Sequence, residues 1–391
     1  MKKITILLIL CIIAAYYSFG QNTIYRFLKP GSFKVGFTDT IIYHEKYRYE
    51  AFGYVGSKPF FLQIWYPLPK KIANQPHLPI NYFFNSGSTD ALHTVNQQLK
   101  LHFNEIVIRD CIADNLLTGL PNTFDGYSYS EILNLALQIK TNSLWQPLND
   151  TLNYPVIIYH HGAQSNAFEN FAMAEYFASK GYIFIAANFH LPYPNTIFGL
   201  KPFDKIIVNE DEESLKTVVA FAQSVSKNRN IFFIGHSLGA QMGFRTFAGD
   251  TCIKGFVSLE TSIEFKSDDQ KIDELWPEVF RKIKTENAYY PFPVLLCAAT
   301  GKNEPFYFFR NLNAQSVVFV STSDQFNHNA YTSIFFLRCF LNRNIIQTDL
   351  KILNNQLHLY VKHVELIADF FNKILNKKWH INNQTIYIKG K

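Results

Sequence analysis

The sequence predicts an α/β protein with a mostly parallel central sheet of about eight strands and helices on both faces. Two observations lead to this class. From Tyr154 onward, short apolar runs that are typical of buried strands alternate with amphipathic stretches of helical period. The repeated strand–helix–strand order implies crossover connections, and these place helices on both sides of parallel strands.

The predicted elements begin with "YPVIIYHHG", a buried strand that ends in a glycine turn. A helix follows over 166–180, with Phe171, Ala174 and Phe177 on one face and Gly181 at its end. The strand "YIFIAANF" comes next, and then a helix over 211–223 whose acidic first turn suits the positive end of a helix dipole. After these, the sequence predicts strand 230–235, helix 238–248, strands 254–260, 293–300 and 316–321, and a long amphipathic helix that closes the chain.

The first 150 residues are less regular. "TDTIIYHE" and "PFFLQIWYPLP" predict two strands that begin the sheet in antiparallel order, and Pro67 and Pro69 end the second. Residues 70–153 form a long insertion with helical stretches around 94–108 and 130–140. Because no Gly/Ser-rich linker separates the insertion, we expect residues 21–391 to form a single domain that carries it.

The N-terminus has the pattern of a cleaved export signal over residues 1–20. Two lysines precede an apolar stretch that is short for a membrane span, and Ser18 and Gly20 are small residues at −3 and −1 of a cut before Gln21. The alternatives are an uncleaved anchor and a lipoprotein that uses Cys11, although the residue before this cysteine is bulky. Export predicts a periplasmic or extracellular protein.

The composition excludes several classes of function. Of the 391 residues, 48% are hydrophobic, so the chain is globular rather than disordered. The formal charge of +6 falls to +4 without the two lysines of the signal (37 − 2 basic against 31 acidic residues). No long basic run is present, so nucleic acid is not an expected partner. The cysteines match no zinc pattern.

The stretch "RNIFFIGHSLGAQMGF" (229–244) contains a Gly-x-Ser-x-Gly pattern centred on Ser237. It follows an apolar strand and opens a helix. A turn this sharp strains the backbone, leaves room only for glycine on both sides, and exposes the hydroxyl at the positive end of the helix. Ser237 is therefore the predicted nucleophile, and the alternative is a structural serine in a turn.

An oxyanion hole needs two backbone N–H groups. Leu238, directly after the nucleophile, is expected to provide one, and Ala163 in the loop "YHHGAQSN" the other, where Gly162 allows a tight turn. His160 and His161 in the same loop invite a metal interpretation. Neighbouring residues at a strand end point to opposite faces and no third ligand is evident, so the sequence predicts no metal site.

The general base is expected to be a histidine that follows the last strand. Among the 12 histidines, His328 is the one just past strand 316–321, and it precedes a helical run over 331–341. His236 lies in the turn of the nucleophile itself, and its side chain is expected to point away from the Ser237 hydroxyl.

The acid that would support this histidine has more than one candidate. Glu260 ends the strand "IKGFVSLE", and Glu304 follows "PVLLCAATGKN", one strand later. Glu260 is preferred because it directly follows an apolar run with no loop between. Glu304 is the alternative acid, and Asp324 is a third candidate that could instead brace the histidine loop.

With these residues in place, the chain resembles the α/β-hydrolases, and within them the secreted platelet-activating-factor acetylhydrolase and dienelactone-hydrolase-like esterases. The segments that carry the resemblance are "GSFKVGFTD" with "LQIWYPLP", "IIYHHGA", "FASKGYIFIAANF" and "FIGHSLGA". The resemblance implies a Ser-His-acid esterase without a cofactor, whose acid follows the strand after the nucleophile helix, here Glu260. The chain departs from that family in having Glu for the usual Asp, in the His-His-Gly-Ala-Gln oxyanion segment, and in the 70–153 insertion.

These residues predict a carboxylic ester hydrolase that works through an acyl-enzyme, on short-acyl lipid or small-molecule esters. A serine peptidase or an acyltransferase is the alternative, because the triad chemistry is shared. A catalytically silent binding protein of the same fold is less favoured, since neither the serine, the histidine nor the oxyanion glycine is missing. Contact with a membrane surface or a lipid aggregate is compatible with a lipid substrate. The sequence does not determine the oligomeric state.

Overall fold

The computed structural model describes residues 23–71, 75–84, 90–107, 123–124, 127–148, 151–207, 209–299, 305–322, 326–340, 346–347, 350–379 and 384–389. The predicted signal peptide over 1–20 lies outside these ranges, and so do two candidate acids, Glu304 and Asp324. Across the described ranges, no helix combines the length and the apolar character that a membrane span requires.

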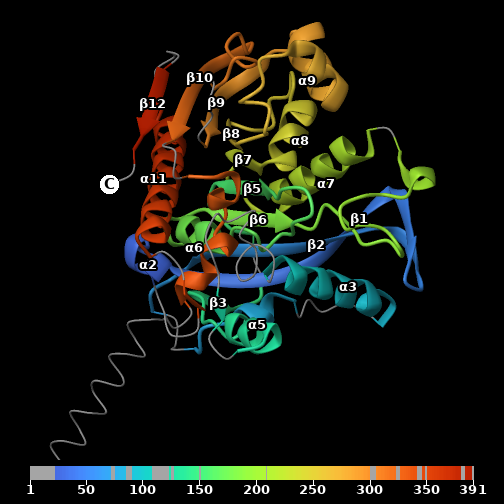
Figure 1. Cartoon of the computed structure of the whole chain (residues 1–391), viewed down its shortest axis with the longest axis vertical. Coiled ribbons are helices and arrows are strands. Elements are labelled where there is room, and N and C mark those ends of the chain that lie inside the picture. Colours follow the sequence, from blue (N-terminus) through green and yellow to red (C-terminus); the bar gives the residue numbers. More distant parts are fainter. Residues whose placement is uncertain are drawn as a thin grey trace, which may run out of the picture.

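Ten strands form one sheet (Figure 1), in the order β12-β10-β9-β8-β7-β5-β6-β2-β1-β4. The strands are β1 (Lys34–Ala51), β2 (Tyr54–Leu68), β4 (Ser143–Trp145), β5 (Val156–His160), β6 (Ile183–Ala187), β7 (Ile231–His236), β8 (Gly255–Leu259), β9 (Tyr290–Ala298), β10 (Ala314–Thr322) and β12 (Gln384–Ile388). β2 pairs antiparallel with both β1 and β6, and the other neighbours in the sheet are parallel. The predicted mostly parallel sheet with an antiparallel start is confirmed.

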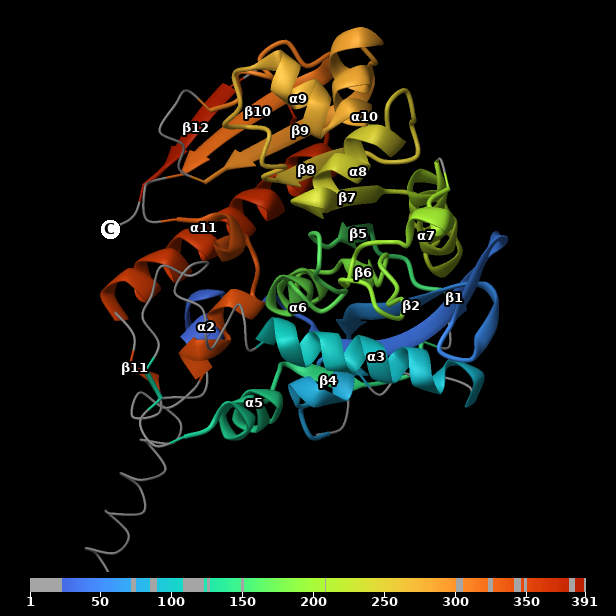
Figure 2. The same cartoon turned by 45° about the vertical axis from the view of Figure 1, so that its right-hand side comes forward.

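Helices cover both faces because the side chains of each strand alternate between two apolar cores. In β5, Ile157 and Tyr159 face one core, which they share with α2 (Thr23–Phe27), α6 (Phe171–Ser179) and α11 (Leu350–Leu375). Val156 and Ile158 face the other core, with α7 (Glu210–Val225), α8 (Leu238–Thr246), α9 (Asp269–Leu275) and α10 (Pro277–Phe280), which continues into the π-helical turn η4 (Arg281–Thr285). Figure 2 shows β8 and β9 between α11 on one side and α9 and α10 on the other.

The sheet has ten strands where about eight were expected, and both additional strands lie at its edges. β4 has only three residues, too few to give a periodic signal. β12 follows α11, so the long helix does not close the chain as predicted. A separate two-stranded pair joins β3 (Thr123–Phe124) to β11 (Ile346–Gln347).

Two predicted helices differ from the structure. The helix expected over 166–180 begins only at Phe171, because the residues before it bond to another segment: Asn170 Nδ2 donates to the Tyr331 carbonyl O at 2.9 Å. The helical run expected over 331–341 consists instead of two 3₁₀ helices, η5 (His328–Tyr331) and η6 (Ile334–Phe340). Both differences arise where the loop of His328 docks against the start of α6.

The insertion packs onto the rest of the chain rather than apart from it. Its helices are η1 (Ile80–Phe84), α3 (Asp90–Ile106) and α5 (Tyr129–Leu137), and it supplies β4 to the edge of the sheet beside β1. In α3, Leu92 and Leu99 pack with Phe61 of β2, while Phe103 joins the core that contains α6 and α11. The insertion therefore shares its apolar contacts with the main sheet.

Candidate active site

Ser237 stands at the turn between β7 and α8 in a backbone conformation that few side chains adopt. Its φ and ψ are 52° and −119°, and it is the N-cap of α8. The flanking glycines permit this turn: a Cβ at Gly235 would lie 2.5 Å from the Ala240 amide N, and a Cβ at Gly239 would lie 2.1 Å from the His160 carbonyl O. A strained, glycine-flanked strand-to-helix turn is the geometry of a nucleophile elbow.

The two backbone N–H groups that the sequence predicts for an oxyanion hole belong to segments beside Ser237. Leu238 is the first residue of α8, and Ala163 follows Gly162 in the loop after β5. Among the described residues, neither N–H group donates to a protein acceptor. Gly162 lets the loop lie against the elbow, because a Cβ there would come within 3.0 Å of His236 Nδ1 and 3.3 Å of Ser237 Cβ.

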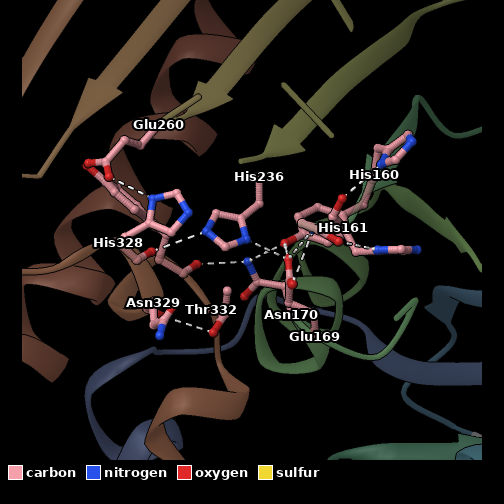
Figure 3. Close-up of polar contacts among 12 residues, drawn as sticks. His160, His161, Glu169, Asn170, His236, Glu260, His328, Asn329 and Thr332 are labelled. Carbon is pink, nitrogen blue, oxygen red and sulfur yellow. Dashed lines mark hydrogen bonds and ion pairs between the residues drawn. The ribbon is translucent and has the colours of Figure 1, made fainter. Parts of the chain in front are cut away.

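Glu260 and His328 are brought together from the ends of two strands (Figure 3). Glu260 directly follows β8 with a φ of 57°, and its Oε1 lies 2.7 Å from His328 Nδ1. Its other oxygen, Oε2, accepts a hydrogen bond from the Ala299 amide N at 2.5 Å. Since Nδ1–H donates to the carboxylate, Nε2 of the neutral imidazole carries no proton and can act as an acceptor.

His328 lies beside the elbow and is partly open to solvent. Its side chain is 33% exposed, and its ring centroid is 4.8 Å from that of His236, the residue before Ser237. Within the described part of the chain, no hydrogen bond joins His328 to Ser237 Oγ. In proteins without a bound substrate, such catalytic hydrogen bonds are often long and tighten in the complex.

No model of a known protein family and no curated protein sequence matches the chain. Among solved structures, a ferulic acid esterase from Streptomyces cinnamoneus superposes with a TM-score of 0.51 over 90% of this chain and 93% of its own, at 13% sequence identity. The chain has the α/β-hydrolase fold. Brefeldin A esterase, described as a bacterial homologue of human hormone sensitive lipase, aligns with a TM-score of 0.42 over 88% of this chain and 78% of its own, at 11% identity.

In this α/β-hydrolase fold, His160 at the end of β5 and His161 directly after it brace the loop that carries Gly162 and Ala163. His161 Nδ1 donates to the Gly162 carbonyl O at 2.8 Å, and its Nε2 accepts from the Phe189 amide N at 3.2 Å. His160 stacks on the Phe189 ring at 3.8 Å between centroids. Burial lowers the pKa of His160 to about 3 and that of His161 to about 4, so both rings are neutral. The described residues include no cluster of side chains that could hold a metal ion.

A second buried carboxylate, Glu264, lies close to Glu260 without contacting His328. It accepts hydrogen bonds from the Thr261 amide N at 3.0 Å and from Thr261 Oγ1 at 2.8 Å. Burial and the negative charge of Glu260 raise its pKa to about 8, so Glu264 is mostly protonated at neutral pH. Of the acids that the structure describes near His328, Glu260 is the one that bonds its imidazole.

The sequence did not point to a further pair behind the elbow of this α/β-hydrolase fold. His236 Nδ1 lies 2.9 Å from Glu169 Oε1, and His236 Nε2 lies 3.2 Å from the His328 carbonyl O. Figure 3 shows His236 between His328 and Glu169. His236 is buried. Glu169 is 67 residues from His236 in the chain and belongs to no recognisable motif, so the sequence gives no signal that would predict this pair.

Proposed function

We propose that the chain is a serine esterase that hydrolyses carboxylic esters through an acyl-enzyme, with Ser237, His328 and Glu260 as its triad. The observation that carries the proposal is the 2.7 Å bond between Glu260 Oε1 and His328 Nδ1, made next to a strained serine at a strand-to-helix turn. A buried carboxylate on a histidine beside a serine is the arrangement that serine hydrolases use on unrelated folds.

In the proposed reaction, Ser237 Oγ attacks the ester carbonyl while His328 Nε2 takes its proton. The carbonyl oxygen becomes an oxyanion, which the N–H groups of Leu238 and Ala163 bind. His328 then returns the proton to the leaving alcohol. A water molecule activated by the same histidine attacks the acyl-enzyme, and the acid departs with Ser237 restored.

Each group has a defined share of the catalysis. Glu260 fixes the His328 tautomer and balances the positive charge that forms on the ring. Its own position is fixed by Ala299, whose N–H holds the second oxygen. Each oxyanion donor is worth on the order of a hundred- to a thousandfold in turnover. The chemistry is complete with protein groups and water, so the proposal includes no cofactor.

The insertion contributes to the substrate side of the proposed site. His102 of α3 stacks on Phe198, with 3.5 Å between ring centroids, and its Nε2 donates to the Gln164 carbonyl O at 3.1 Å. Gln164 directly follows the proposed oxyanion donor Ala163. We propose that α3 and the loop that carries Phe198 border the acyl or alcohol pocket, for short-acyl lipid or small-molecule esters.

The experiment is a hydrolysis screen on the purified mature chain. The panel holds p-nitrophenyl acetate, butyrate and octanoate, a feruloyl ester, and the matched p-nitroanilides. We expect turnover of esters that exceeds turnover of amides by at least tenfold, with a preference for the shorter acyl chains. Faster cleavage of amides would favour the alternative peptidase. Product formation only in the presence of an added alcohol would favour the alternative acyltransferase.

The proposal includes export. The pattern of residues 1–20 supports cleavage before Gln21 and a periplasmic or extracellular location. N-terminal sequencing of the protein recovered from the periplasm or the medium is expected to start at Gln21, and a chain that keeps Met1 would contradict cleavage.

A further inference from the structure

We propose that Glu169 and His236 form a buried ion pair that positions three segments of the proposed catalytic site: the oxyanion loop with Ala163, the elbow with Ser237 and the loop of the base His328. The inference rests on the proposed function, which it deepens: it assigns two positioning residues to the reaction that Ser237 and His328 would perform.

The hydrogen bonds of His236 show why its ring carries a charge. One ring nitrogen, Nδ1, faces a carboxylate oxygen of Glu169 at 2.9 Å, and the other, Nε2, faces the His328 carbonyl O at 3.2 Å. Both partners are acceptors. A neutral imidazole has a single N–H, so only the doubly protonated ring can donate to both.

The surroundings of Glu169 are those of a carboxylate. Its Oε1 accepts from Tyr159 Oη at 2.5 Å, and the Gly162 amide N lies 3.3 Å from both carboxylate oxygens. Glu169 is 3% exposed, so an unpaired charge here would be costly. Burial raises its pKa, but the charge of His236 outweighs this and brings the value to about 2. In the same way, burial lowers the pKa of His236, and Glu169 more than compensates and raises it.

The pair joins segments that are far apart in the chain. Glu169 holds the oxyanion loop through the Gly162 N–H, and His236 is the neighbour of the nucleophile within the elbow. His236 in turn holds the backbone of His328, whose side chain Glu260 holds from the opposite side. A shift of either member would therefore move the oxyanion donors relative to the base.

The next residue in the chain strengthens the same junction. Asn170 Nδ2 donates to the Tyr331 carbonyl O at 2.9 Å, and its Oδ1 accepts from the Ser333 amide N at 3.1 Å. The Glu169 carbonyl O accepts from the Ile334 amide N at 3.1 Å. The backbone after His328 is thus tied to the segment of Glu169 whether or not the ion pair forms. The pair adds the link to the elbow.

The test uses Glu169→Gln, which keeps the shape and an acceptor but removes the charge. Without the carboxylate, the buried His236 ring becomes neutral. The amide oxygen must keep the place of Oε1 to accept from Tyr159 Oη, so the single N–H of His236 can donate to this oxygen or to the His328 carbonyl O, but not to both. The matched control is Glu175→Gln in α6. Glu175 is as deeply buried as Glu169, with 2% of its surface exposed. It accepts from Ser143 Oγ at 2.5 Å and from Tyr25, but it bonds none of the proposed catalytic residues.

Two readouts separate positioning from stability. In Glu169→Gln we expect kcat for p-nitrophenyl butyrate to fall about 10- to 100-fold with KM changed less than about threefold, because a misplacement on the order of 1 Å can cost about a hundredfold in rate. In Glu175→Gln both constants are expected to stay within about twofold. Equal effects of the two substitutions would overturn the proposal.

The second readout is ¹⁵N NMR of histidine-labelled native protein, with the His236 signals identified by their loss in His236→Gln. Glu169, Tyr159, His161, His328 and Glu260 are the titratable groups around this ring. We expect both His236 nitrogens to be protonated at pH 7, because each faces an acceptor. A neutral His236 ring at pH 7 would overturn the proposal even if Glu169→Gln does not fold. If the native protein hydrolyses no ester, the proposed function fails, whereas the NMR result still decides whether the ion pair exists.

Discussion

Replacing Glu260 by Gln tests the proposed triad, because it exchanges one carboxylate oxygen for an NH₂ group. The side chain keeps its length, and the two hydrogen bonds of the native carboxylate determine how the amide must lie. The Ala299 N–H, 2.5 Å from Oε2, requires an acceptor, so the amide oxygen turns toward Ala299. The amide NH₂ then faces His328 Nδ1, which must become an acceptor. The proton of His328 moves to Nε2, and the ring can no longer take a proton from Ser237.

The magnitude follows from two costs. Turning the amide to restore the active tautomer leaves the buried Ala299 N–H without an acceptor, at about 1 to 3 kcal/mol. The lost carboxylate also no longer stabilises the imidazolium. Charges about 4 Å apart at an effective dielectric constant of about 20 attract by about 4 kcal/mol, and solvent at the one-third exposed His328 reduces this value. Together we expect a loss of about 4 to 5.5 kcal/mol, which is a fall in kcat of about 10³- to 10⁴-fold.

The assay is steady-state hydrolysis of p-nitrophenyl acetate at pH 8, with circular dichroism to check folding. Glu264→Gln is the matched control. Glu264 is also buried, lies four residues after Glu260 in the chain, and has a carboxyl group that is already mostly protonated at neutral pH. Its activity is expected to stay within about twofold of native. Glu304→Gln, the alternative acid, is expected to do the same.

The reasoning would be refuted by a folded Glu260→Gln variant that keeps more than about a tenth of native turnover. A crippled Glu304→Gln beside an active Glu260→Gln would move the acid to Glu304. Equal losses in Glu260→Gln and Glu264→Gln would indicate a structural effect of removing any carboxyl group from this pocket.

Three further predictions follow from the same structure. In Gly162→Ala, the new Cβ would lie 3.0 Å from His236 Nδ1 and displace the oxyanion loop, so kcat is expected to fall about a hundredfold at unchanged fold, measured with the same ester; native kcat would show that the loop accommodates the methyl group. Burial raises the pKa of Glu175 to about 7 and, together with the charge of Glu260, that of Glu264 to about 8, both from 4.5. At these two positions the folded chain binds more protons than the unfolded chain, so their contribution to the free energy of unfolding falls as pH rises from about 5 to about 8. Thermal unfolding at pH 5.5 and pH 8 is expected to show a smaller loss of Tm in the double Gln variant than in the native chain, and an equal loss would contradict this assignment. His102→Ala removes the stack on the loop that borders the proposed pocket, so the ratio of kcat/KM between butyrate and octanoate esters is expected to change at least threefold, and an unchanged ratio would separate α3 from substrate selection.

The sequence predicted the elements whose signals are local. Apolar runs and glycine turns after Tyr154 marked the strands correctly, and the spacing around Ser237 predicted the strained turn that the structure contains. The edge strands β4 and β12 were not predicted, because strands of three and five residues are too short to show a hydrophobic periodicity. Such edge strands are defined by the neighbour with which they pair.

The candidate site shows the same limit. Chain order led to His328 as the expected base and left Glu260, Glu304 and Asp324 as candidate acids, since a carboxylate after either of two adjacent strands, or in the histidine loop itself, was compatible with it. The 2.7 Å contact between Glu260 Oε1 and His328 Nδ1 depends on the tertiary structure and cannot be read from the spacing of residues in the sequence. Glu169 was missed for a related reason: its partners Gly162, Tyr159 and His236 lie 7, 10 and 67 residues away and come together only in the fold.

The central claim is that Ser237 is a nucleophile activated by His328. The most direct measurement is reaction of the folded mature protein with a fluorophosphonate probe, followed by intact mass and peptide mapping by mass spectrometry. The account predicts one adduct per chain, located on Ser237, that is absent in Ser237→Ala and slowed at least a thousandfold in His328→Ala. An unmodified native chain, or an adduct on another residue, would contradict it.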